Sequence, residues 1–73
     1  MTLDSLKENE QATIIAINND GLALQLLSMG FILGEKIKLE RIAPLNDPII
    51  ISSGNNYISI RKKDAQQITI SKS

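Results

Sequence analysis

The chain has 73 residues, 42% of them hydrophobic, and its eight basic and eight acidic residues give a formal net charge of +0. This size fits one small domain over residues 1–73, and the balanced charge excludes a general attraction to nucleic acid or to an anionic membrane. The sequence has no cysteine and no histidine, which excludes disulfides, thiolate ligands and the usual neutral-pH base.

The N-terminal half predicts one helical turn, one strand and one helix. Two leucines spaced three apart predict a turn of helix within residues 2–6 that covers an open end of the core. Residues 12–17 are apolar at nearly every position, which is typical of a central strand covered on both faces. A two-turn helix is expected over residues 22–29, with Asn19 or Asp20 as its N-cap.

The C-terminal half predicts four more strands. Residues 36–40 alternate between polar and apolar side chains, and the phase reverses at Arg41, which indicates a β-bulge. The other expected strands span residues 49–51, 57–61 and 67–71, with a hairpin turn at 53–56 and a polar turn at 62–66. Five short strands around so small a core favour a mainly β, partly open barrel with a short helix after the first strand.

The apolar runs are too short for a membrane span, and residues 1–10 lack the pattern of a signal peptide. We therefore expect a cytoplasmic protein with no direct membrane insertion. No enzyme activity is expected either, because the serines have no histidine beside them and the glycines do not form a phosphate-binding loop.

No metal or cofactor site is expected. The eight acidic residues form no spaced pair on one helix face. Asp47 lies in a constrained loop before Pro48, where we interpret its side chain as a structural turn that binds nearby backbone N–H groups. Lysines and arginines at 36, 38, 41 and 61–63 are interpreted as a solvated face, because small barrels that bind single strands add aromatic side chains for stacking.

An apolar segment, Phe31-Ile32-Leu33, follows the helix and lies between two glycines. Gly30 is placed for a left-handed helix cap, and Gly34 marks a second turn. Three consecutive side chains cannot all point inward, so the segment either plugs the barrel end or forms an exposed patch. Both readings stay open, and the hypothesis for a partner-binding surface comprises Phe31, Ile32, Leu33 and Leu45, the last in a loop expected to lie nearby.

Three segments in this order carry a family resemblance: residues 26–34 (LLSMGFILG), 43–49 (APLNDPI) and 60–65 (IRKKDA). In this order they resemble the FeoA family, the small ferrous iron transport protein A of bacteria. The family commonly has proline at the position of Leu33 and glycine at that of Asn46, although asparagine can also adopt a left-handed conformation.

The resemblance implies an SH3-like β-barrel and a non-enzymatic, cytoplasmic accessory protein of ferrous iron uptake. It implies one partner, the membrane GTPase ferrous iron transport protein B, and no nucleic acid; weak self-association is left open. Two alternatives remain at this point. One is a small nucleic-acid-binding barrel, and the other is a stand-alone relative of the SH3-like domain of iron-dependent repressors.

Overall fold

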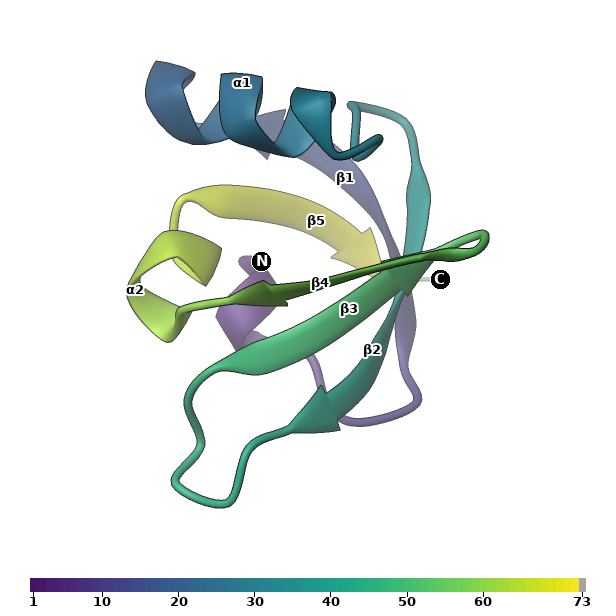
Figure 1. The fold of residues 1–73 in the computed structure, drawn as a ribbon, viewed down its shortest axis with the longest axis vertical. Helices are drawn as coiled ribbons and strands as arrows, with labels where there is room; N and C mark the ends of the chain where they lie inside the picture. Colours follow the sequence, from purple (N-terminus) through teal and green to yellow (C-terminus); the bar gives the residue numbers. More distant parts are fainter. Residues whose placement is uncertain (73) are drawn as a thin grey trace.

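Five antiparallel strands form one curved sheet, with a single longer helix above it (Figure 1). The computed structural model describes residues 1–72. The elements in chain order are η1 (Leu3–Ser5), β1 (Gln11–Ile17), α1 (Asp20–Ser28), β2 (Lys36–Ile42), β3 (Ile49–Ser53), β4 (Asn56–Ile60), α2 (Lys62–Ala65) and β5 (Ile68–Lys72). The predicted fold class, mainly β with a short helix after the first strand, is confirmed. Within the described residues no helix is long and apolar enough to cross a membrane.

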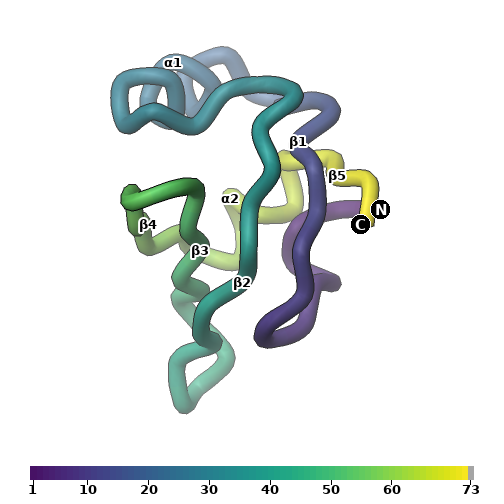
Figure 2. The backbone as a smooth tube through the Cα atoms, turned by 90° about the vertical axis from the view of Figure 1, so that its right-hand side faces the viewer, coloured from purple at the N-terminus to yellow at the C-terminus, as the bar shows by residue number. Residues whose placement is uncertain are grey.

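The sheet has the strand order β4-β3-β2-β1-β5, so β4 and β5 are its edges. The edge at β5 is partly covered by the N-terminus, because Thr2 forms a bridge with Thr69 and the Ile70 N–H donates to the Met1 carbonyl at 2.9 Å. The tube in Figure 2 shows the N-terminus beside the end of β5. The edge at β4 faces α1 instead.

Two bulges curve the sheet. The register of β2 shifts between Leu39 and Arg41, as its sequence pattern predicts. The register of β1 shifts between Ile14 and Ala16, which leaves Ile15 as the extra residue opposite β5. Ile15 is 53% exposed, so the expectation that β1 is covered on both faces is wrong. The alternation along the strand sends Ile14 inward and Ile15 outward, and within residues 1–72 no element covers that outer position.

Helix α1 begins two residues earlier than predicted. The Asn19 side chain is its N-cap and accepts the Leu22 N–H at 2.9 Å, whereas Asp20 is the first helical residue. Leu26 is buried beneath the helix, but Leu24 and Leu27 are exposed. The helix carries no charged residue after Asp20. Its apolar side chains therefore lie both on the face that packs against the core and on faces that are exposed to solvent.

The helix ends in a complete Schellman motif. Gly30 has φ +88°, its N–H donates to the Leu27 carbonyl at 3.0 Å, and the Phe31 N–H donates to the Leu26 carbonyl at 2.9 Å. The left-handed cap predicted at Gly30 is confirmed. Phe31 and Leu26, the two residues that this motif brings together, are both fully buried.

The core is a single cluster at the centre of the barrel. As predicted, the leucines of the first helical turn cover one end of it. The buried apolar residues are Leu3, Leu6, Ala12, Ile14, Leu26, Phe31, Ile37, Leu39, Ile49, Ile51, Ile60, Ala65, Ile68 and Ile70.

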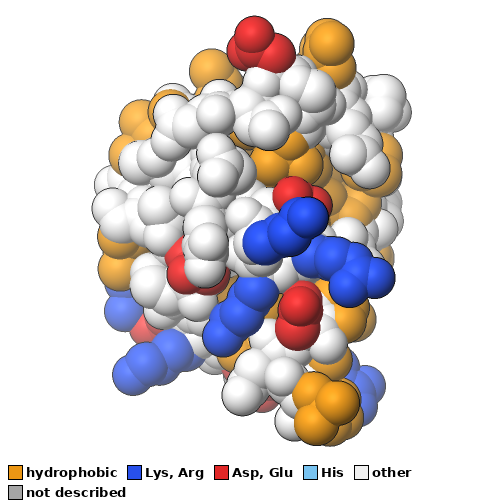
Figure 3. Space-filling model, turned by 90° about the vertical axis from the view of Figure 1, so that its left-hand side faces the viewer, with side chains coloured by type: hydrophobic (Ala, Val, Ile, Leu, Met, Phe, Trp, Pro, Cys, Tyr) orange, Lys and Arg blue, Asp and Glu red, His pale blue; other side chains and the backbone are white. Residues whose placement is uncertain are grey.

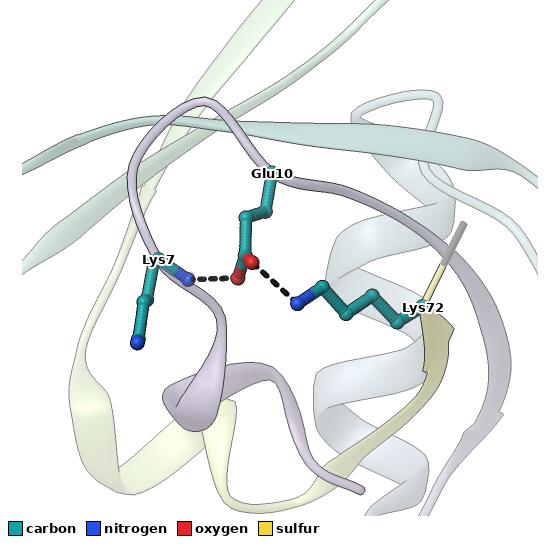
Figure 4. A network of polar contacts seen from close by, with 3 residues as sticks. All are labelled: Lys7, Glu10 and Lys72. Atoms are coloured by element: carbon teal, nitrogen blue, oxygen red, sulfur yellow. Dashed lines mark hydrogen bonds and ion pairs between the residues drawn. The ribbon is translucent and has the colours of Figure 1, made fainter.

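A polar network joins the N-terminal loop to the end of β5 (Figure 4). The Glu10 carboxylate accepts the Lys7 backbone N–H at 2.8 Å and forms an ion pair with Lys72. Asn9, in the same loop, has a left-handed φ of +71°. The hydrogen bond from the Lys72 side chain lowers the pKa of Glu10 below 4.5, and the Lys7 N–H lowers it further.

This lowered pKa predicts a small dependence of stability on acid. A carboxylate whose pKa is lower in the folded than in the unfolded state stabilises the fold above the unfolded pKa. That contribution is lost as the pH falls through the folded pKa. Glu10→Gln should therefore reduce the fall in unfolding free energy below pH 4.5, which urea titrations at successive pH values would measure.

The effect should be modest because the pair is at the surface, and 1 M salt should weaken it in the wild type. If the two proteins lose stability in parallel as the pH falls, the Glu10–Lys72 pair contributes nothing to the acid response.

Candidate functional site

The four apolar residues of the partner-surface hypothesis do not share one environment. Phe31 is 0% exposed, whereas Ile32 is 46%, Leu33 is 58% and Leu45 is 90% exposed. The apolar segment therefore both plugs the barrel end and forms an exposed patch, the two alternatives that its sequence left open. Phe31 plugs the barrel, which removes it from any contact surface, and the next two side chains face solvent.

Leu45 lies at the opposite end of the molecule from Ile32 and Leu33, so the expectation of one continuous surface is corrected. Figures 1 and 2 both place the loop of residues 43–48 far from α1. Strand β2 runs between the two sites, and its seven residues span about 20 Å at the usual rise per residue. The chain thus has two separate exposed apolar sites, one after α1 and one at the tip of the β2–β3 loop.

The turns that hold these two sites are built as expected in most respects. Gly34 has φ +84°, and its N–H donates to the Ile14 carbonyl at 2.8 Å, which fixes the apolar segment against β1. Asn46 has φ +67°, the left-handed conformation that asparagine tolerates better than most residues. The Asp47–Pro48 peptide bond is cis.

The side chain of Asp47 has a role different from the one expected. Its Oδ1 accepts the Lys62 backbone N–H at 2.9 Å, and not an N–H within its own loop. Lys62 is the first residue of α2, where backbone N–H groups lack partners within the helix. Asp47 therefore ties the loop that carries Leu45 to the start of α2. No local sequence pattern predicts this contact, because the two residues are far apart along the chain.

A groove between α1 and the end of β4 is a feature that sequence reasoning missed. It has a volume of about 230 Å³. Figure 3 shows hydrophobic side chains in a hollow below α1, with basic and acidic side chains beside it. The residues that line it are Leu22, Gln25, Leu26 and Met29 of α1, together with Ser59, Ile60, Arg61 and Asp64.

The acidic residues of the described chain do not gather into a metal site. Over residues 1–72, no three carboxylates converge where they could hold an ion. Several are engaged elsewhere: Glu8 accepts the Ile42 N–H, Glu35 accepts the Ser53 hydroxyl and Glu40 accepts the Ser52 hydroxyl.

We therefore predict that the isolated protein binds neither ferrous iron nor zinc tightly. It lacks thiolate and imidazole ligands, and its carboxylates are not arranged as a site. Calorimetric titration with each ion should detect no stoichiometric binding with a Kd below about 1 μM. A one-to-one isotherm in that range would contradict the prediction.

Comparisons with known proteins agree with this fold. A family model described as the FeoA domain matches residues 1–72. Over 71 residues the chain is 32% identical to an Fe(2+) transport protein A/Fe(2+) transporter FeoB fusion protein of Porphyromonas gingivalis. That match covers 96% of this chain but only 8% of the fusion protein.

Two solved structures extend the comparison. Iron(II) transport protein A from Clostridium thermocellum is 37% identical, with a TM-score of 0.90, and the match covers 99% of this chain and 45% of that one. The zinc complex of Stenotrophomonas maltophilia FeoA, described as a prokaryotic SH3 domain protein, is 24% identical, with a TM-score of 0.82 and coverage of 97% and 89%. The fold is thus SH3-like.

Proposed function

The chain belongs to the FeoA family, whose role is in ferrous iron transport, and from this we propose that it is a non-enzymatic, cytoplasmic accessory protein that binds ferrous iron transport protein B. The observation that carries the proposal is the fusion protein of Porphyromonas gingivalis, in which a related domain and the transporter FeoB are one polypeptide. Fusion holds two modules at a high effective concentration. The fusion therefore indicates that domains of this type act next to the transporter.

The exposed apolar side chains give this binding a physical basis. Ile32 and Leu33 stand next to each other on a turn that Gly34 fixes to β1. Leu45 stands on a loop that Asp47 fixes to α2. Large apolar side chains held rigidly in solvent lose little conformational freedom when a partner covers them, and such residues commonly carry most of the binding energy. We propose that both sites contact the transporter.

The experiment pairs a thermal melt with capture of the detergent-solubilised transporter from the same organism. We expect Ile32→Ser/Leu33→Ser to melt like the wild type, because neither side chain is in the core, and to bind at least about tenfold more weakly. Leu45→Ser should also weaken capture, and because the two sites are well separated, its effect should be additive with that of the double variant.

The matched control is Ile15→Ser, which removes an exposed apolar side chain that lies outside both proposed contacts. It should capture the transporter as the wild type does. If folded Ile32→Ser/Leu33→Ser and Leu45→Ser proteins also capture it at full strength, neither site is the interface.

A further inference from the structure

The groove below α1 lies beside an unused strand edge. Strand β4 pairs with β3 on one side, and within residues 1–72 no backbone hydrogen bond joins it to any other segment. Alternate residues of an antiparallel strand direct their N–H and C=O groups away from the partner strand. The outer side of β4 therefore offers backbone donors and acceptors in extended geometry along its five residues.

The floor of the groove supplies apolar contacts along the same edge. Leu22, Leu26 and Met29 line it from α1, and Ile60 lines it from the end of β4. Side chains of an added strand alternate between the two faces of a sheet. A strand laid along β4 would thus direct every second side chain toward α1, into apolar surroundings.

The charges at one end of the groove favour an acidic residue in the occupant. Arg61 follows the last residue of β4 directly and lines the groove, and two lysines come next in the sequence. Within the described chain no carboxylate forms an ion pair with Arg61. The Asp47 side chain is already engaged at the Lys62 N–H, which leaves Asp64 as the acidic group lining the groove. Figure 3 shows several basic side chains close together beside the hollow.

We propose that this groove binds an extended segment of the partner protein, which pairs with the free edge of β4, inserts alternate apolar side chains below α1 and places an acidic residue against Arg61. The inference rests on the proposed function, because it names the chemistry of the transporter segment that the domain would take. Main-chain pairing would supply affinity, and the apolar floor and Arg61 would supply selectivity.

The test uses the full chain and overlapping synthetic peptides of about twelve residues, each long enough to pair along β4, that cover the soluble parts of the same organism's transporter. We expect at least one peptide with an acidic residue near an alternating apolar pattern to bind. Binding should slow amide hydrogen exchange in β4 by at least about tenfold, because its outer N–H groups gain partners.

Two substitutions test the groove itself, each with a matched control. Gln25→Trp fills the groove from the exposed surface of α1, while Leu24→Trp adds the same side chain to a neighbouring helical position that does not line it. Arg61→Glu reverses a charge that lines the groove, while Lys63→Glu makes the same change two residues away, outside the lining. The first member of each pair should weaken peptide binding at least about tenfold, and the control should not.

Each outcome decides between the two proposals. If the protein captures the intact transporter but none of the peptides, or binds a peptide without protecting β4, the groove proposal is overturned and the proposed function stands. Equal peptide binding by Gln25→Trp, Arg61→Glu and their controls overturns the groove proposal too. Failure of the wild type to capture the intact transporter overturns the proposed function and, with it, the assignment of the segment.

Discussion

Replacing Phe31 with alanine is expected to destabilise the fold by about 3–5 kcal/mol, the usual cost of truncating a buried phenylalanine. Phe31 is the single phenylalanine of the chain and is fully buried. A domain of this length is expected to have a total stability of only about 4–11 kcal/mol, so this loss would remove a large part of it. Urea denaturation should show a lower midpoint with an unchanged slope.

The matched comparison is the adjacent residue. Ile32 is 46% exposed, so Ile32→Ala should cost about 1 kcal/mol or less. Phe31→Leu keeps most of the apolar volume and should fall between the two alanine variants. Equal midpoints for Phe31→Ala and Ile32→Ala would show that Phe31 does not plug the barrel as the structure places it.

Gly30→Val is expected to be the second most destabilising change, for two independent reasons. The left-handed φ of +88° is strained for any residue with a Cβ and most of all for a β-branched one, which costs about 1–3 kcal/mol. In addition, a Cβ atom at this position would lie 2.9 Å from Asn56 Nδ2. A thermal melt should therefore show a clear loss of stability even for Gly30→Ala.

A comparison with Gly34 separates the cost of backbone strain from the cost of the contact with Asn56. The Gly34 φ of +84° is almost the same, but a Cβ placed there would meet nothing within 4 Å. Gly34→Ala should thus report backbone strain alone, and the additional cost of Gly30→Ala should report the contact with Asn56. Combining Gly30→Ala with Asn56→Ala should recover that additional cost, because it removes the crowded side chain. A Gly30→Val protein that melts like the wild type would contradict the assigned backbone geometry.

The features that the sequence predicted correctly depend on neighbours along the chain. The cap at Gly30 follows from a helix that must end, and the bulge after Leu39 follows from a reversed alternation. Each of these signals lies within a few residues. The family resemblance then supplied the SH3-like arrangement, which the alternation alone could not distinguish from another small barrel.

The features that the sequence did not predict depend on distant segments. Leu45 follows Leu33 closely in the sequence, but the extended strand β2 between them holds the two sites far apart in space. The groove exists because α1 folds over the end of β4, about thirty residues later, and no local pattern encodes that approach. Ile15 is exposed because its side of β1 faces solvent, and the composition of a single strand cannot reveal which face another element covers.

The hydrogen bond between Asp47 Oδ1 and the Lys62 N–H has a consequence for how the two ends of the barrel act together. It connects the loop that carries Leu45 to the residue that directly follows Arg61 of the groove. If a partner occupies both places, this bond is a direct connection through which a displacement of the loop would act on the groove. If binding at one place changes the affinity at the other, thermodynamic linkage requires that the change be reciprocal and by the same factor. An affinity measured at one place would then hold only for a stated occupancy of the other.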